Sequence, residues 1–165
     1  MQSLFKTIFF IFLISQGVFG QKFERYKNSF DTLFYSESLG YSKKISVTLP
    51  LEYQDNLNTK KYPLMIVFDS QNIRSHQYIL KTIDYLTSNE QIPSSVIISI
   101  QSSLENRYKE TQLEISDDNV LGSKNELFIL KELIPYIQKR YKTILFNILI
   151  GHSRYGYFTS YLLSK

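Results

Sequence analysis

The sequence contains no cysteine, which excludes disulfides, thiolate metal sites, a cysteine nucleophile and a lipid-modified cysteine anchor. It has only two histidines, too few for a histidine-rich metal cluster. Its basic residues occur as singles and pairs and never as a run of five or more, so a nucleic-acid-binding stripe is not indicated. We therefore expect no metal, no other cofactor and no nucleic-acid partner.

The composition that remains is typical of a single globular domain. Of the 165 residues, 43% are hydrophobic, 15% are aromatic and 21% are charged. This balance excludes a disordered tail or a fibrous repeat, and the length is too short for two well-packed domains.

The first twenty residues resemble a secretory signal peptide. Lys6 precedes an apolar run over residues 8–14, and Gly20 offers the small residue that a signal peptidase needs. The run is shorter than the roughly 20 apolar residues that cross a bilayer. We expect cleavage after residue 20, no stable membrane insertion, and a secreted or periplasmic protein. The mature domain, residues 21–165, has 18 basic and 15 acidic residues because Lys6 is the only charge removed.

Hydrophobic periodicity predicts five strands. Apolar and polar residues alternate over residues 30–37 and 44–50, which indicates two half-buried strands that form a hairpin around Gly40. Nearly continuous apolar runs indicate strands buried on both faces, at residues 64–69, 96–100 and 144–150.

Helical spacing connects these strands. It predicts a helix over residues 75–87 with Ser75 as N-cap, and another from residue 123, where Ser123 and Glu126 have the form of a capping box and Pro135 predicts a kink. Residues 101–122 are polar and predict a long loop, whereas residues 157–165 can be helical. The order indicates an α/β fold, a mostly parallel sheet with flanking helices that is led by an antiparallel hairpin.

Ser153 is the sharpest candidate for chemistry. It lies between a predicted strand and a predicted helix, with Gly151 two residues before it and Gly156 three residues after it. A tight strand-to-helix turn exposes the serine hydroxyl, needs small neighbours, and directs N–H groups of the helix start at an oxyanion. The segment is similar to the nucleophile elbow of α/β-hydrolases.

Several segments together resemble the Putative esterase family of α/β-hydrolases, which includes ferric-siderophore esterases and esterase D. The matching residues are 44–50, 67–69, 92–93, 106–107, 132–137 and 150–153. The resemblance implies that Ser153 attacks an ester carbonyl and that two backbone N–H groups form the oxyanion hole. By position these N–H groups belong to Arg154 and Gln71. His152 matches the residue that commonly precedes the serine and would not be the base.

Two positions depart from the family pattern. Tyr155 stands where the family usually has glycine two residues after the serine, so its ring is expected to crowd the turn or to form a wall of the pocket. Ser70 follows Asp69 where the family has glycine, which reduces the expected backbone freedom of the oxyanion loop. Arg107, Arg154 and Tyr155 are candidates to line a substrate pocket.

The catalytic acid and base are missing from the expected place. In α/β-hydrolases they follow the serine in the chain, but none of the twelve residues after Ser153 is Asp, Glu or His. We expect an N-terminal portion whose acid and base lie beyond Lys165, or else an inactive domain. A third alternative is a rearranged catalytic triad of Ser153, His76 and Asp69, because all three residues are expected near the same edge of the sheet.

The sequence thus predicts an exported serine hydrolase that acts on a small-molecule carboxylic ester through an acyl-enzyme on Ser153. A noncatalytic binding or interaction domain on the same scaffold and an acyltransferase remain alternatives. The strand at residues 144–150 would lack a neighbour on one side. Residues 21–165 alone are therefore expected to aggregate and to show no turnover.

Overall fold

The first elements of the chain form an antiparallel hairpin. The computed structural model describes residues 24–55, 57–113 and 121–164, so the predicted signal peptide lies outside the described residues. Strand β1 (Tyr26–Ser36) pairs with β2 (Tyr41–Pro50), and Gly40 turns between them with φ of 78°, a left-handed conformation that glycine adopts without strain. The predicted hairpin is confirmed.

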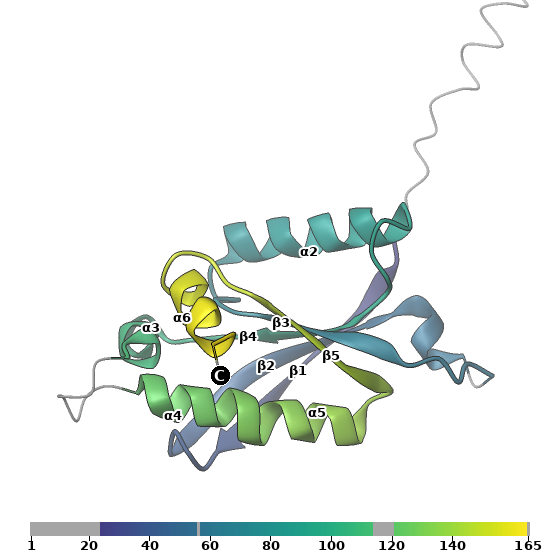
Figure 1. The fold of residues 1–165 in the computed structure, drawn as a ribbon. Helices are drawn as coiled ribbons and strands as arrows, with labels where there is room; N and C mark the ends of the chain where they lie inside the picture. The colour runs from purple at the N-terminus through teal and green to yellow at the C-terminus, as the bar shows by residue number, and fades with distance from the viewer. Residues whose placement is uncertain (1–23, 56, 114–120, 165) are drawn as a thin grey trace, which may run out of the picture.

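The three apolar runs form parallel strands beside this hairpin. Strand β3 (Tyr62–Val67) pairs in parallel with β4 (Val96–Ile100) on one side and with β5 (Thr143–Ile150) on the other. Strand β2 joins the set by antiparallel pairing with β4, which makes the sheet order β1-β2-β4-β3-β5 (Figure 1). The predicted α/β fold is confirmed, with two parallel and two antiparallel strand pairings.

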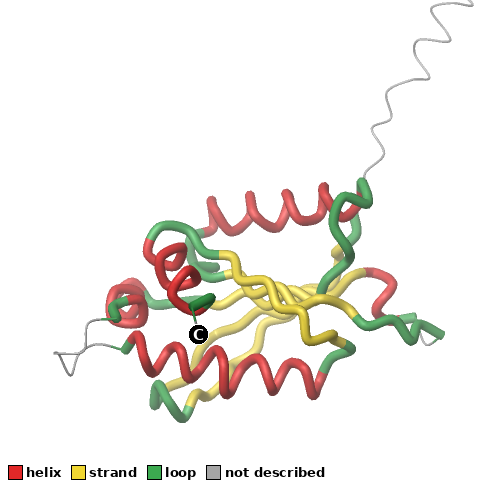
Figure 2. The backbone as a smooth tube through the Cα atoms, viewed as in Figure 1, coloured by secondary structure: helices red, strands yellow, loops and turns green. Residues whose placement is uncertain are grey.

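Helices cover both faces of the sheet (Figure 2). On one face lies α2 (Ile73–Ser88), where Ile83 packs with Met65 and Ile97. The other face carries the larger core and is covered by four helical elements, α4 (Gly122–Leu127), η2 (Phe128–Leu133), α5 (Ile134–Arg140) and α6 (Arg154–Leu162). None of the described helices has the length and apolar character that crossing a bilayer requires.

Two predicted helix starts are wrong. Helix α2 begins after Asn72, and Ser75 lies within its first turn, where its hydroxyl donates to the Asn72 carbonyl at 3.3 Å. Helix α4 begins after Leu121, so Ser123 lies inside the helix and forms no capping box. A capping serine needs non-helical backbone angles, and Ser123 and Ser75 lie two and three residues beyond the observed N-caps, inside the helices.

Pro135 changes the helical hydrogen bonding where a kink was expected. It has no N–H to donate to the preceding turn, and that turn widens into the π-helical stretch η2. The chain then continues into α5 as one helical rod (Figure 1).

The polar segment at residues 101–122 is not entirely a loop, because it contains α3 (Leu104–Thr111). The side chain of Ser103 caps this helix by accepting from the Asn106 N–H at 2.9 Å. The helix buries Glu110 and Thr111, so its buried side is polar and lacks the apolar stripe that would have revealed it. Residues 114–120 of the predicted loop lie outside the described residues.

Among the described residues, strand β5 lies at one edge of the sheet, which confirms the predicted lack of a neighbour, whereas its predicted burial on both faces is wrong. No strand among the described residues pairs with its outer edge, and Leu145 and Phe146 are 87% and 59% exposed. An apolar run becomes a buried strand only where neighbouring elements cover it. This strand leads directly into the turn that carries Ser153.

Candidate active site

Ser153 occupies a strained turn between β5 and α6. It is the N-cap residue of α6, with φ of 57° and ψ of −118°. A non-glycine residue rarely adopts such angles, and the surrounding structure has to maintain them. The Ser153 carbonyl accepts from the Tyr157 N–H at 3.1 Å, while its side chain is exposed. The geometry is that of a serine presented at the carboxyl end of a sheet.

Gly151 allows the strand to approach the helix closely. A Cβ atom at this position would lie 2.4 Å from the Tyr155 carbonyl oxygen and 2.9 Å from the Gly156 nitrogen. A Cβ atom on Gly156 would meet nothing nearer than 3.5 Å, an ordinary contact. Of the two glycines that flank Ser153, only Gly151 is required by the packing.

The loop after β3 lies beside this turn. The Phe68 N–H donates to the Ile150 carbonyl at 3.0 Å, which holds the carboxyl ends of β3 and β5 together. Asp69 has a positive φ of 65°, while Ser70, at the position where glycine was expected, does not. The residue of this loop with left-handed backbone angles is therefore Asp69. Ser70 does not have a positive φ, so the glycine expected at position 70 is not required there.

Side-chain contacts stabilise the conformation of Asp69. Arg107 on α3 donates from Nε at 2.7 Å and from a terminal nitrogen at 2.6 Å to the Asp69 carboxylate. The Gln71 amide also donates to this carboxylate at 2.7 Å, and its oxygen accepts from the Ser102 N–H at 2.9 Å. The carboxylate raises the pKa of Arg107 through these hydrogen bonds. Arg107 is thus committed to an ion pair.

The two predicted oxyanion donors both lie at this end of the sheet. Gln71 follows β3, and Arg154 is the first residue of α6. Neither backbone N–H donates a hydrogen bond to another described residue. Their assignment as donors remains a prediction.

Tyr155 does not crowd the turn. Its side chain is 1% exposed and its ring stacks on Phe68 with a centroid distance of 4.8 Å and an interplanar angle of 11°. Its hydroxyl donates to Glu110 Oε2 at 2.7 Å. The expectation that the ring would crowd the turn or wall the pocket is wrong, because the ring points into the core.

The hydroxyl of Tyr155 belongs to a buried group of polar residues that we call the Glu110 cluster, formed by Tyr41, Lys43, Ser102, Glu110 and Tyr155. Lys43 Nζ lies 2.7 and 2.8 Å from the two carboxylate oxygens of Glu110, and the Ser102 hydroxyl donates to Oε2 at 2.7 Å. Tyr41 also donates to this carboxylate. Burial lowers the pKa of Lys43, whereas burial and the negative charge of Glu110 raise the pKa of Tyr155.

Neither histidine is placed as a base for Ser153. His76 lies in the first turn of α2, with Nε2 2.8 Å from the Ser99 hydroxyl oxygen, and burial lowers its pKa. Asp69 is occupied by Arg107 and Gln71, and His152 is exposed on the turn. The rearranged set of Ser153, His76 and Asp69 is therefore not formed.

Arg154 lies beside a cavity of about 480 Å³ between α3 and α6. Its guanidinium is 4.1 Å from the ring centre of Tyr108, a cation–π contact, and Leu113 and Tyr157 also line the space. Of the three residues expected to line a pocket, Arg154 does so, whereas Arg107 pairs with Asp69 and Tyr155 is buried.

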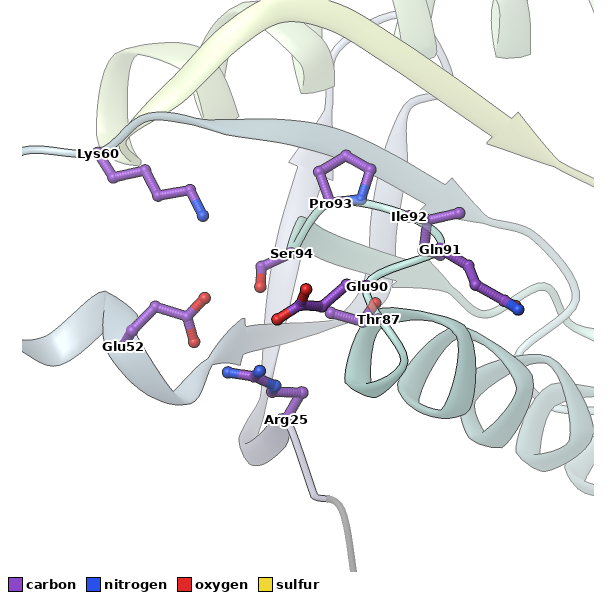
Figure 3. Close-up of a pocket in the computed structure, with 9 residues that line it drawn as sticks. All are labelled: Arg25, Glu52, Lys60, Thr87, Glu90, Gln91, Ile92, Pro93 and Ser94. Carbon is purple, nitrogen blue, oxygen red and sulfur yellow. The ribbon is translucent and has the colours of Figure 1, made fainter.

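A second cavity, of about 430 Å³, lies at the opposite end of the sheet, near the amino ends of β3 and β4 (Figure 3). Charged side chains of both signs face it, from Arg25, Glu52, Lys60 and Glu90. No residue of the Ser153 turn lines it. It is therefore separate from the candidate active site.

Among the described residues, no group of three or more His, Asp or Glu side chains is placed to hold a metal ion.

A family model described as "Putative esterase" matches residues 36–165. No curated protein matches the chain in sequence.

Solved structures match the chain over most of its length. An IroE-like serine hydrolase from Shewanella oneidensis is 22% identical with a TM-score of 0.65, over 79% of this chain and 44% of that one. The ferulic acid esterase AmCE1/Fae1A from Anaeromyces mucronatus is 17% identical with a TM-score of 0.64, over 86% and 55%. The enterochelin esterase from Shigella flexneri is 17% identical with a TM-score of 0.64, over 81% and 32%. The likeness shows a shared fold, and the chain spans between a third and about half of these proteins.

Proposed function

Because the chain belongs to the Putative esterase family, we propose that the protein is a carboxylic ester hydrolase that forms an acyl-enzyme on Ser153. The observation that carries this proposal is the backbone of Ser153, a non-glycine residue held at φ of 57° in the short turn between strand β5 and helix α6. Such a turn presents the hydroxyl to a substrate at the helix N-terminus.

In the proposed reaction, Ser153 Oγ bonds to the ester carbonyl carbon and loses its proton to a base. The negative charge on the carbonyl oxygen is stabilised by the N–H groups of Arg154 and Gln71. The alcohol then leaves with a proton as the ester C–O bond breaks, and water hydrolyses the acyl-enzyme to release the acid. No metal or organic cofactor takes part in these steps.

We further propose that the acid and histidine are supplied by polypeptide that follows residue 165. Three findings support this. The two histidines of the chain are not placed at Ser153, the outer edge of β5 is unpaired among the described residues, and the chain spans a third to half of similar structures. The first of these findings also favours the alternative, a noncatalytic binding domain on the same scaffold.

The test is ester turnover by the full-length protein. We expect hydrolysis of short p-nitrophenyl esters, labelling of Ser153 by a fluorophosphonate, and loss of both in Ser153→Ala. Ser160→Ala is a matched control, because Ser160 is an exposed serine on the same helix. Absence of turnover and labelling in the full-length protein would favour the noncatalytic alternative. Turnover that persists in Ser153→Ala would place the chemistry elsewhere.

Export is part of the proposal and rests on Lys6, the apolar run at residues 8–14 and Gly20. N-terminal sequencing of protein recovered outside the cytoplasm should begin near Gln21. Recovery with residues 1–20 intact would contradict it.

A further inference from the structure

The Glu110 cluster connects the two segments that carry the proposed oxyanion donors. On one side, the Ser102 N–H donates to the side chain of Gln71 at 2.9 Å. On the other side, the hydroxyls of Ser102 and Tyr155 contact each other, and both donate to Glu110 Oε2 at 2.7 Å. Tyr155 immediately follows Arg154. A continuous chain of hydrogen bonds therefore joins the loop after β3 to the Ser153 turn.

From this geometry we propose that Tyr155 and Glu110 are positioning residues that set the distance between the N–H groups of Gln71 and Arg154. This inference rests on the proposed esterase function. The two donors come from separate segments, and the stabilisation of an oxyanion depends on the placement of both. Neither Tyr155 nor Glu110 touches the substrate, because both side chains are buried beneath the turn.

Tyr155 is held firmly enough for this role. Its N–H donates to the His152 carbonyl at 3.2 Å, its ring stacks on Phe68, and its hydroxyl is bound to Glu110. The strained angles of Ser153 persist only where such contacts over-determine them.

Glu110 cannot move without breaking a buried ion pair. The Glu110 side chain is 0% exposed and that of Lys43 is 3% exposed. A shift of the carboxylate would leave the Lys43 charge buried without a partner. The Asn125 side chain also donates to the Glu110 backbone carbonyl at 3.0 Å. The cluster is therefore a rigid support and not an adaptable surface.

The experiment compares Tyr155→Phe with Tyr161→Phe in the full-length protein. Tyr161 lies on the same helix, and its hydroxyl donates to Glu126 Oε2 at 2.7 Å, so the control also removes a tyrosine hydrogen bond to a glutamate. Tyr155→Phe should lower kcat for a p-nitrophenyl ester by about tenfold to a hundredfold at an unchanged KM, because misplacement by about 1 Å costs this much. Tyr161→Phe should keep the wild-type kcat.

The rate is counted per Ser153 titrated with the fluorophosphonate, so loss of folded protein alone leaves kcat unchanged. An unchanged kcat per titrated serine in Tyr155→Phe would overturn the inference. If Tyr155→Phe does not fold, Ser102→Ala replaces it, since this variant removes the hydroxyl and keeps the N–H that binds Gln71.

Hydrogen exchange separates this inference from the proposed function. If the wild-type protein hydrolyses no ester, the esterase proposal fails, and the hydrogen-bonded amides of residues 155 and 157 then decide the positioning role. They should exchange at least about tenfold faster in Tyr155→Phe than in Tyr161→Phe when measured well below global unfolding. Equal exchange in the two variants would overturn it.

Discussion

The packing at Gly151 makes a quantitative prediction about the Ser153 turn. In Gly151→Ala the new methyl group would lie 2.4 Å from the Tyr155 carbonyl oxygen, about 1 Å closer than an ordinary contact. The obstacle is backbone and not a flexible side chain, so the strand or the helix has to move. Overpacking of this kind costs about 1–3 kcal/mol, and we expect about 3 kcal/mol here because three backbone atoms lie within 3 Å of the methyl group.

Gly156→Ala is the matched control in the same turn. Its methyl group would meet its nearest neighbour at 3.5 Å, and Gly156 lies within α6. Alanine in a helix is more favourable than glycine by about 0.5–1 kcal/mol, so this variant should be slightly more stable than wild type. The two variants should thus differ by about 4 kcal/mol in the free energy of unfolding.

The assay is urea unfolding of the full-length protein followed by circular dichroism. A difference of about 4 kcal/mol displaces the midpoint by more than 1 M urea for a small domain, which is easily resolved. The reasoning is refuted if Gly151→Ala unfolds within about 0.5 kcal/mol of wild type. It is also refuted if Gly156→Ala is the less stable of the two, since the close approach would then lie elsewhere.

Three more predictions follow from burial and charge. Burial lowers the pKa of His76, so the contribution of His76 to stability is present above the unfolded pKa of about 6.5 and is lost as the pH falls below that value. His76→Gln should therefore lose less unfolding free energy than wild type between about pH 7 and about pH 5. An unchanged pH dependence of unfolding would contradict this. Lys43→Met should cost about 3–5 kcal/mol in urea unfolding because it leaves the Glu110 carboxylate buried and unpaired, and a cost below about 1 kcal/mol would show that water reaches the cluster. Residues 21–165 alone should aggregate through the edge of β5, and Leu145→Lys should slow that aggregation in light scattering, whereas an equal rate would exclude this edge as the contact.

Local sequence patterns were sufficient to locate the five strands and Ser153. The run at residues 96–100 coincides with β4, because an uninterrupted apolar strand has few other ways to be buried. Ser153 was identified because Gly151 and Gly156 flank it after an apolar run. The strained φ and ψ of Ser153 could not be predicted from the sequence, since these angles depend on how β5 and α6 pack together.

The Glu110 cluster was missed, although one signal pointed to it. Lys43 has the same parity along β2 as Ile45 and Val47, which places its side chain on the buried face of the sheet. A lysine there requires a buried partner. No pattern in the sequence identifies Glu110 as that partner, because the two residues are 67 positions apart and meet only through tertiary packing.

By itself, the sequence determined which segments become strands, where the serine lies between a strand and a helix, and that neither a disulfide nor a thiolate metal site can form, because these depend on residue type and short-range periodicity. The tertiary structure alone decided that His76 binds Ser99 instead of facing Ser153 and that the Tyr155 ring enters the core. Each of these depends on contacts between residues far apart in the chain. Their geometry is set by the packing of helices on both faces of the sheet.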